Sequence, residues 1–321
     1  MRYSLGVDIG GTKILGAVVD EEGTIVSKTR VPTDREEGVD ALPEAVDLFL
    51  AEATKPIEAI CLAVAGFVEY PSGRILFAPN LSFSNPGVGA VLSREYGLPV
   101  VVENDANAAA WAENLFGAGR GTLNMLMVTV GTGIGGGMIL DGRLYRGSRG
   151  FGAEFGHMPV TLDGPACNCG SHGCLESVAS GTALGRMARE RVAGFPDSEV
   201  LRLAHGKVED ITGAMVGKAA DTYDPFAIEL LWDLGTMLGV GLAGLAKAFD
   251  PELIVVGGGV LEEGESILGA AREEVLARYK GQVDPPSVVS ASLGNDAGVV
   301  GAAQLALEAA SARGIGEMHG G

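Results

Sequence analysis

The apolar positions of the chain fall into short runs with strand-like spacing and longer segments with helix-like spacing. Apolar runs at 5–9 and 14–19 flank a glycine-rich turn, and this pattern predicts a β-hairpin. Further strands are predicted at 57–64, 74–77 and 100–103, and helices near 88–96 and over 106–116. Strands that alternate with helices are typical of an α/β sheet.

The glycine-rich hairpin occurs twice in the sequence. When the chain is shifted by 121 positions, residues 5–20 align with residues 126–141, and five of the sixteen positions are identical. Glycine-rich chains align easily with themselves, so a chance similarity is the alternative to a duplication. A duplication would give each half one turn with exposed backbone N–H groups. Thr12, Lys13 and Thr132 beside these turns favour phosphate binding over plain turns.

The last third of the chain predicts two helices and a buried strand. The helices are expected at 226–249 and 298–313. Between them, an apolar strand at 253–256 leads into three glycines, Gly257, Gly258 and Gly259. Their spacing does not match the fingerprint of a dinucleotide-binding turn, and nothing else in the sequence indicates a hydride cofactor.

The segment 154–176 concentrates side chains that bind metals. It contains three of the four cysteines, and its candidate ligands are His157, Cys167, Cys169 and Cys174. Three thiolates and one imidazole complete a tetrahedral zinc site and leave no open position for water. The sequence therefore predicts a structural Zn²⁺ in this segment.

This ligand set has two alternatives. A disulfide framework is disfavoured because four cysteines in 321 residues are few, and Cys61 lies alone in an apolar run. His172 lies between Cys169 and Cys174 and could replace His157 as the fourth ligand. A histidine in so tight a loop more often points to solvent, so His157 is favoured.

Composition restricts the classes of function. A chain of 321 residues with 47% hydrophobic residues can form two domains with cores of their own. The net charge of −18 argues against a nucleic-acid partner, which needs a clustered basic surface. No uninterrupted apolar segment reaches the roughly 18 residues of a membrane span, and no signal-peptide pattern is present. We therefore expect a cytoplasmic protein without a membrane partner.

Six motifs resemble those of the ROK family of bacterial sugar kinases and regulators. In chain order they are Asp8-Ile-Gly-Gly-Thr-Lys13, Glu103-Asn104-Asp105-Ala-Asn107-Ala, Thr129-Val-Gly131-Thr-Gly133-Ile-Gly-Gly, Glu154-Phe-Gly-His157, Cys167-Asn-Cys-Gly-Ser-His-Gly-Cys174-Leu-Glu176 and Val256-Gly-Gly-Gly259. The motifs span nearly the whole chain. Within the family, the sequence is most similar to glucokinases of Gram-positive bacteria.

The resemblance implies an α/β fold of the actin-like ATPase type, in which two ribonuclease-H-like domains flank a central cleft. This agrees with the duplicated hairpin. A small domain would comprise residues 1–115 plus 298–321, and a large domain with the zinc-binding segment would comprise residues 116–297. The nucleotide and the sugar would bind in the cleft.

The implied activity is transfer of the γ-phosphoryl group of ATP to the 6-hydroxyl of D-glucose. The family pattern makes Asp105 the catalytic base, and Asp8 would act on Mg²⁺ through water. Gly10, Gly11, Thr12 and Lys13 would contact the terminal phosphates from one domain, and Gly131, Thr132 and Gly133 from the other. Gly257, Gly258 and Gly259 would form the turn on the adenosine side, unless they are only a helix entry.

By the same resemblance, the sugar hydroxyls would be bound by Asn80, Asn104, Asp105, Glu154, His157 and Glu176. Carboxylates and amides suit this task because each can bind two neighbouring hydroxyls. Zinc would set the positions of Glu154 and Glu176, which flank the metal-binding segment. His157 could bind zinc through one ring nitrogen and donate to the sugar through the other.

Other members of the family define the alternatives. The substrate could be another sugar, such as N-acetylmannosamine, fructose or allose, and residue types alone do not rank these sugars. A sugar-sensing transcriptional regulator would need an added DNA-binding domain, for which we expect no room before the first strand. Polyphosphate as the donor would call for a basic track that the sequence does not show. The family often forms dimers or tetramers, so a homo-oligomer is expected.

Overall fold

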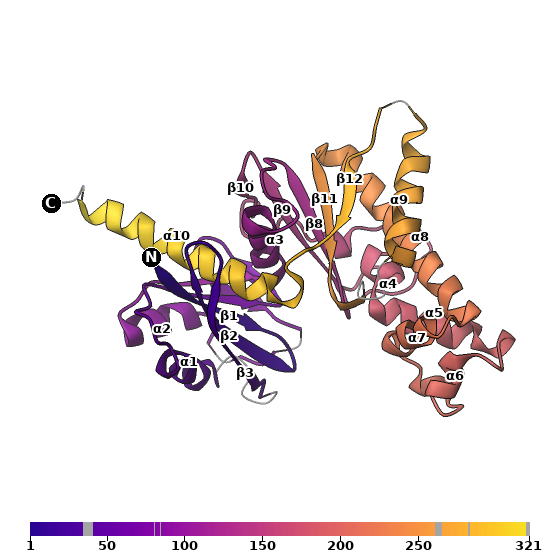
Figure 1. The fold of residues 1–321 in the computed structure, drawn as a ribbon, viewed down its shortest axis with the longest axis horizontal. Coiled ribbons are helices and arrows are strands. Elements are labelled where there is room, and N and C mark those ends of the chain that lie inside the picture. The colour runs from indigo at the N-terminus through magenta and orange to yellow at the C-terminus, as the bar shows by residue number, and fades with distance from the viewer. Residues whose placement is uncertain (35–40, 80, 84, 261–264, 282, 319–321) are drawn as a thin grey trace. The chain divides into compact units, whose positions relative to one another are not determined.

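The computed structural model describes residues 1–34, 41–79, 81–83, 85–260, 265–281 and 283–318. The chain divides into two compact units (Figure 1). The first unit comprises residues 1–121, 137–153 and 293–321, and the second comprises residues 122–136 and 154–292.

The first sheet combines an antiparallel hairpin with parallel strands, in the order β3-β2-β1-β4-β7. Its strands are β1 (Tyr3–Ile9), β2 (Lys13–Asp20), β3 (Ile25–Pro32), β4 (Ile60–Val64) and β7 (Val100–Asn104). β1 is antiparallel to β2 and parallel to β4, and β4 is parallel to β7. The carboxyl ends of β1, β4 and β7 therefore meet at one edge of the sheet, the edge at which α/β sheets bind ligands.

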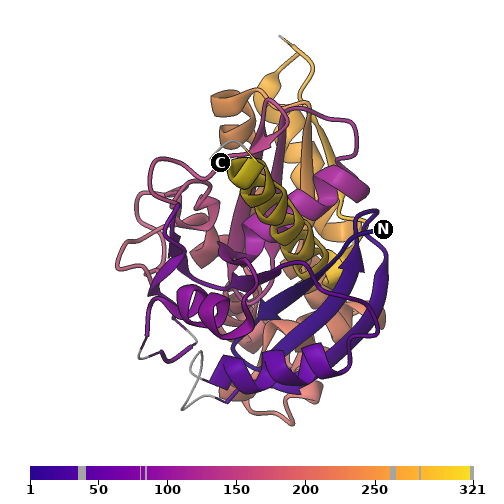
Figure 2. The ribbon, with the colours of Figure 1, turned by 90° about the vertical axis from the view of Figure 1, so that its left-hand side faces the viewer.

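Helices cover both faces of the first sheet (Figures 1 and 2). α1 (Leu42–Ala51) and α2 (Val88–Tyr96) pack on one face, and α3 (Asp105–Phe116) and α10 (Ala297–Met318) pack on the other. β4 is buried along its whole length, as expected for a parallel strand that is covered on both sides. The C-terminal helix α10 contacts β1, β2 and β4 and so closes the N-terminal unit.

A small hairpin and the segment 137–153 complete the first unit. β5 (Phe67–Glu69) and β6 (Arg74–Phe77) form the antiparallel hairpin. The segment 137–153 packs on it: Tyr70 N donates to Arg149 O at 2.9 Å, and the rings of Phe67 and Phe151 are 5.7 Å apart. These contacts explain why 137–153 belongs to the first unit, whereas the predicted large domain of 116–297 includes it.

The second sheet repeats the strand order of the first, as β10-β9-β8-β11-β12. Its strands are β8 (Met125–Val130), β9 (Ile134–Leu140), β10 (Arg143–Leu144), β11 (Leu253–Gly257) and β12 (Ser287–Ser290). β9 and β10 are antiparallel, while β8, β11 and β12 are parallel. In each sheet the first three strands in sequence form a meander, and the two remaining strands are parallel to the first strand of that meander. The predicted second hairpin is confirmed, because β8 and β9 are neighbours in the sheet.

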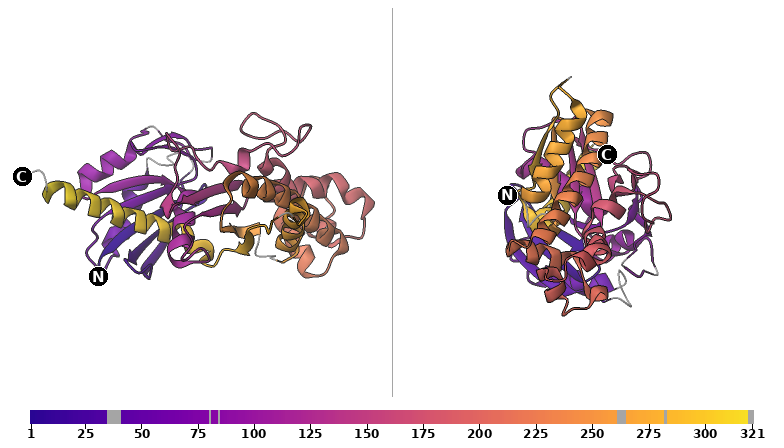
Figure 3. Two further views of the ribbon diagram at one scale, coloured as in Figure 1. Left: turned by 90° about the horizontal axis from the view of Figure 1, so that it is seen from above. Right: turned by 90° about the vertical axis from the view of Figure 1, so that its right-hand side faces the viewer.

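The second unit is rich in helices. They are α4 (Leu175–Ala179), α5 (Gly181–Arg191), α6 (Glu199–Leu203), α7 (Gly213–Asp221), α8 (Pro225–Phe249) and α9 (Glu265–Tyr279), with the short 3₁₀ helices η2 (Phe155–His157), η3 (Val192–Gly194) and η4 (Val208–Asp210); a further 3₁₀ helix, η6 (Gly294–Asp296), precedes α10 in the first unit. α8 and α9 lie side by side (Figure 3). Asp224 caps α8 by accepting from Ala227 N at 2.9 Å.

α8 has the length and hydropathy of a membrane span, and it is the one such helix in the described part of the chain. Of its most apolar window, 61% is buried inside the protein. This burial is typical of the core helix of a folded domain.

Candidate active site and metal centre

Two carboxylates lie at the carboxyl edge of the first sheet. Asp8 is the penultimate residue of β1, and Asp105 begins α3 directly after β7. The pKa of Asp8 is raised to about 6, chiefly by burial and further by the charge of Asp105, while Lys13 acts in the opposite direction. Burial also raises the pKa of Asp105, against the lowering effect of Ala106 N, which donates to its Oδ1 at 2.9 Å. The predicted base and the predicted magnesium-site residue are thus brought together.

Asn104 forms the N-terminal cap of α3. Its Oδ1 accepts from Asn107 N at 3.0 Å, and its Nδ2 donates to Gly66 O at 3.2 Å. From the sequence, Asn104 and Asp105 are each compatible with a helix cap or a ligand site. The capping role falls to Asn104, so Asp105 is not needed as the cap. The Asn104 amide retains one N–H and one lone pair beyond these two bonds.

The tip of the first hairpin is formed by Gly10, Gly11, Thr12 and Lys13. Gly10 N donates to Lys13 O at 3.0 Å, and Thr33 Oγ1 donates to Gly10 O at 2.7 Å. The first turn of α10 lies beside Asp8, because a Cβ on Gly298 would come within 3.1 Å of Asp8 Oδ2. The sequence pattern singles out neither Thr33 nor Gly298, since both are distant in the chain from the residues they contact.

The predicted sugar ligands are divided between the two units. Asn104 and Asp105 belong to the first unit, and Glu154, His157 and Glu176 belong to the second. Asn80 lies outside the described residues.

The predicted metal ligands converge in the second unit. One nitrogen of His157 and the sulfurs of Cys167, Cys169 and Cys174 lie within 4.8 Å of one another. His157 Nδ1 is 3.6 Å from Cys167 Sγ, and the sulfurs of Cys169 and Cys174 are 3.7 Å apart. All four cysteines of the chain are free of disulfides. This donor set and its spacing fit a tetrahedral zinc ion.

His172 lies outside this cluster. Its side chain is exposed, and its backbone pairs with Ala166 in an isolated β-bridge. His157, in the 3₁₀ turn η2, is the histidine that the fold places beside the thiols.

Local backbone bonds shape the cysteine loop. Cys167 N donates to Ser171 O at 2.8 Å, and Gly170 N donates to Cys167 O at 3.0 Å. Burial raises the pKa of Cys167 to about 12, whereas the backbone N–H of Ser171 lowers the pKa of Cys169. Because zinc binds thiolates, metal binding at this cluster would release the protons of thiols such as Cys167.

Glu176 connects the metal cluster with the second glycine turn. Its Oε2 accepts from Ile134 N at 2.9 Å, and its Oε1 lies 4.0 Å from Cys167 Sγ. A Cβ on Gly133 would lie 2.3 Å from Oε2, so this position has room for glycine only. Glu154 precedes η2, and its carbonyl oxygen accepts from His157 N at 3.1 Å.

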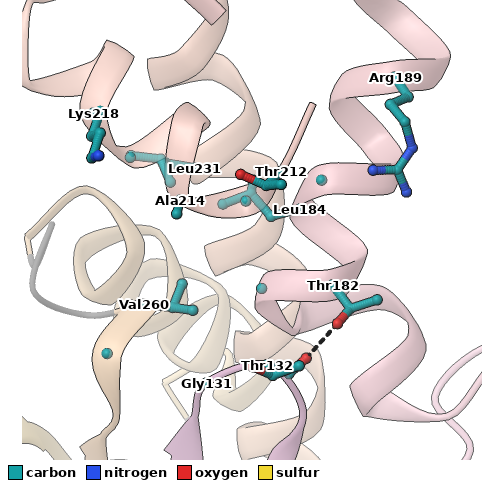
Figure 4. Close-up of a pocket in the computed structure, with 15 residues that line it drawn as sticks. Gly131, Thr132, Thr182, Leu184, Arg189, Thr212, Ala214, Lys218, Leu231 and Val260 are labelled. Atoms are coloured by element: carbon teal, nitrogen blue, oxygen red, sulfur yellow. Dashed lines mark hydrogen bonds between the residues drawn. The ribbon is translucent and has the colours of Figure 1, made fainter. Parts of the chain in front are cut away.

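A cavity of about 750 Å³ opens in the second unit (Figure 4). It is lined by Gly131, Thr132, Gly181, Thr182, Leu184, Gly185, Arg189, Thr212, Gly213, Ala214, Gly217, Lys218, Leu231, Gly259 and Val260. Thr182 Oγ1 donates to Thr132 O at 2.7 Å and joins α5 to the glycine turn. Lys218 and Arg189 lie on opposite sides of the cavity in Figure 4. Its volume is that of a small-molecule site.

Only some of the glycines that were predicted to contact the nucleotide line this cavity. Gly131, Thr132 and Gly259 line it, whereas Gly133 packs on Glu176. Gly258 has φ +103, and a Cβ there would lie 2.4 Å from Val130 O, so its role is to let β11 pass close to β8. Gly257 ends β11 and does not line the cavity.

The walls that α5, α7 and α8 contribute were not identified from the sequence. They include Thr182 and Arg189 of α5, Lys218 of α7 and Thr212, which caps α7, and none of them lies in a recognised motif. The one available signal is the recurrence of glycine beside threonine at Gly181-Thr182 and Thr212-Gly213. Such pairs at helix starts permit close backbone packing around a ligand.

Comparison with known proteins places these features in context. The sequence model of the ROK family matches residues 4–309. A glucokinase of Streptomyces coelicolor is 44% identical over 314 residues, which cover 96% of this chain and 98% of that protein. A glucokinase of Halalkalibacterium halodurans is 39% identical, and the match covers 95% of this chain and 94% of that protein. The crystal structure of a ROK family glucokinase from Streptomyces griseus, in complex with glucose and AMPPNP, is similar with a TM-score of 0.84 and 43% identity, covering 95% of this chain and 99% of that one.

Proposed function

The chain belongs to the ROK family, and we propose that it is a glucokinase, which transfers the γ-phosphoryl group of ATP to the 6-hydroxyl of D-glucose. Its fold is that of the actin-like ATPases. The observation that carries this proposal is the pair of carboxylates, Asp8 and Asp105, at the carboxyl edge of the first sheet. The glucose-bound and nucleotide-bound Streptomyces griseus relative supports the same substrates for this chain.

Asp105 is the general base of the proposed reaction. It accepts the proton of the sugar 6-hydroxyl as the oxygen attacks the γ-phosphorus. The pKa of Asp105 is raised towards neutral pH, and a carboxylate with a raised pKa is a more effective base at neutral pH than an ordinary one. Asn104 and the start of α3 hold its backbone in place.

Asp8 is the residue through which the first unit would hold Mg²⁺. Bound Mg²⁺ would neutralise charge on the phosphate oxygens, and it keeps much of its water shell in such sites. A carboxylate whose pKa is about 6 is ionised at neutral pH and gains from a nearby cation.

The nucleotide contacts follow from the glycine turns and the cavity. Gly10 N closes the first turn on Lys13 O, and the backbone N–H groups of Gly11 and Thr12, with the ammonium of Lys13, suit the terminal phosphates. In the second turn Gly131 N likewise donates to Gly133 O, and the N–H groups of Thr132 and Gly133 are donors of the same kind. The adenosine fits the cavity bordered by Gly131, Thr132 and Gly259, whose volume is about 750 Å³.

The sugar would be recognised by Asn80, Asn104, Asp105, Glu154, His157 and Glu176. In this set, His157 turns Nδ1 towards Cys167, which leaves Nε2 as the atom for a sugar hydroxyl. Glu176 is fixed through Oε2, so Oε1 is the oxygen for the sugar. A hydroxyl of the wrong epimer would leave one of these groups unpaired, which disfavours its binding.

The cluster of His157, Cys167, Cys169 and Cys174 would hold a structural Zn²⁺. Four protein ligands complete its coordination, so its contribution is to fold the loop that leads into α4, the helix that carries Glu176. We further assign the chain to the cytoplasm, where free cysteines persist, and we propose a homo-oligomer, a dimer or tetramer, as the assembled form.

The test is ADP release by the purified chain with ATP and Mg²⁺ across a panel of hexoses and acylated hexosamines. Preferred turnover of glucose is the expected result. A preference for N-acetylmannosamine, fructose or allose would keep the kinase and reject glucose as its substrate. Turnover with polyphosphate in place of ATP would change the assigned donor, and the absence of turnover on every sugar would favour a sugar-sensing regulator.

A further inference from the structure

Glu103 is a buried carboxylate next to Asn104 and Asp105 to which the reaction assigns no role. Only 5% of the residue is exposed. Its Oε1 accepts from Asn104 N at 3.0 Å and from Asn107 Nδ2 at 3.0 Å. Both donors belong to the turn from β7 into α3, on which Asp105 lies. The carboxylate therefore holds the backbone N–H just before the proposed base and the Asn107 side chain just after it.

Arg146 is the ionic partner of this carboxylate. Its Nε donates to Glu103 Oε2 at 2.5 Å, and its side chain is only 20% exposed. The guanidinium also lies 4.9 Å from the centre of the Tyr70 ring. A charge-assisted hydrogen bond of this kind is stronger and more directional than a neutral one.

The loop that carries Arg146 is itself anchored to the first unit. Gly152 N donates to Arg146 O at 2.9 Å, and Tyr70 N donates to Arg149 O at 2.9 Å. Gly150 has φ +99, and a Cβ on it would lie 2.2 Å from Val68 O, so the loop packs directly on β5. Arg146 is thus held at a fixed place relative to Glu103.

We propose that Arg146 is a positioning residue for the phosphoryl transfer: by neutralising and orienting Glu103, it holds Asn104 and Asp105 in the geometry that the sugar 6-hydroxyl requires. This inference rests on the proposed function. The effect of Arg146 passes through the Glu103 carboxylate to the turn between β7 and α3.

Loss of Arg146 would leave a buried carboxylate without its cation, which is strongly unfavourable. Glu103 and Arg146 border a cavity of about 500 Å³ that also reaches Ser93 and Arg94. An unpaired Glu103 would turn towards water in that cavity and release Asn104 N and Asn107 Nδ2. Displacing a reacting group by about 1 Å can lower the rate about a hundredfold.

The experiment compares Arg146→Met, Arg149→Met and the double variant Glu103→Gln/Arg146→Met with the wild-type chain. Arg149 lies on the same loop, with its guanidinium 5.3 Å from the Phe151 ring, and serves as the matched control. In Arg146→Met we expect kcat for glucose to fall about tenfold to a hundredfold. Because Asn104 also moves, the KM for glucose rises about fivefold or more, while the KM for ATP changes less than about twofold. Arg149→Met keeps wild-type kinetics.

Partial unfolding would lower the apparent kcat and leave both KM values unchanged, so the rise in glucose KM separates positioning from a loss of folded enzyme. The double variant removes the unpaired charge and keeps an acceptor at Oε1. We therefore expect its kcat to recover to within about threefold of wild type, which would show strong coupling between the two sites. Suppose that the wild-type chain is active. Unchanged kinetics in Arg146→Met, or a double variant that does not recover activity, would then overturn this inference and leave the proposed function standing. A wild-type chain that phosphorylates no sugar overturns the proposed function and this inference with it.

Discussion

The Oε2 atom of Glu176 accepts a hydrogen bond from the backbone N–H of Ile134 at 2.9 Å. Glu176 follows the last cysteine of the metal cluster by two residues, and Ile134 begins β9 directly after the second glycine turn. One carboxylate therefore joins the cluster that would bind zinc to the turn that would bind phosphate. We therefore expect a substitution in the metal cluster or in the glycine turn to alter sugar binding through Glu176.

Replacement of Gly133 by alanine tests this connection. The new Cβ would lie 2.3 Å from Glu176 Oε2 and would push the carboxylate away. Because a hydrogen bond to a charged group is lost or distorted, we expect the KM for glucose to rise about tenfold or more. Gly194→Ala is the control, since nothing lies within 4 Å of a Cβ at that position. A rise in the KM for ATP with an unchanged KM for glucose would show that Gly133 serves the phosphates alone.

Replacement of Asp105 by asparagine tests the proposed base. The amide is nearly isosteric but cannot take up the hydroxyl proton, and general-base assistance is worth about 10²–10⁴ in rate. We therefore expect kcat to fall by about that factor, while glucose binding measured by calorimetry stays largely intact. Lost glucose binding with preserved turnover would reject the assignment.

Asp8 predicts a dependence of stability on pH. Its pKa is raised from 3.8 to about 6 in the folded protein, so ionised Asp8 is less favourable there than in the unfolded chain. The resulting destabilisation is fully present above pH 6, decreases as the pH falls through that value, and is absent below the unfolded pKa of 3.8. Without ATP and Mg²⁺, Asp8→Asn should raise the free energy of unfolding at pH 8 by up to about 3 kcal/mol, since each pKa unit corresponds to about 1.4 kcal/mol.

Urea denaturation of both proteins at pH 8 and at pH 4 measures this effect. The advantage of Asp8→Asn should be much smaller near pH 4, where Asp8 is protonated in the folded protein and only partly ionised in the unfolded chain. A variant that is less stable than wild type at pH 8 would contradict the electrostatic account of this site.

Removal of one thiol tests the proposed zinc site. In Cys169→Ala we expect the zinc content measured by mass spectrometry to fall, the melting temperature to drop and the KM for glucose to rise, because the loop that positions Glu176 loses its metal. Cys61→Ala is the control, since Cys61 is fully buried in β4 and lies outside the cluster. Strong chelation during refolding should reproduce the effect of Cys169→Ala. Loss of the metal with unchanged glucose affinity would remove the structural role of zinc.

Local patterns were sufficient for much of the fold. β6, α2 and α8 begin and end within one residue of their predicted limits, because turns and helix stops such as Asp250-Pro251 bound the apolar pattern there. The strand predicted at 57–64 begins later, at Ile60, since apolar Ile57 lies before the first backbone pairing of β4. Strand β3 has regularly alternating burial but no punctuating motif, and it was not predicted.

Contacts between residues that are distant in the chain could not be predicted from the sequence. The metal ligands were predictable because the three cysteines lie within eight residues and carry a recognisable rhythm. Glu103 and Arg146 are separated by 43 positions, and Thr132 and Thr182 by 50. No pattern along the chain records such pairs, because the folding of the β-strands and helices brings them together.

The identity of the product tests whether the chain transfers phosphate from ATP to the 6-hydroxyl of glucose. Purified chain would be incubated with ATP, Mg²⁺ and glucose, and the sugar phosphate would be identified by ¹H–³¹P correlation NMR. We expect glucose 6-phosphate, formed together with an equal amount of ADP. A phosphate on another hydroxyl, or ADP without any sugar phosphate, would contradict it.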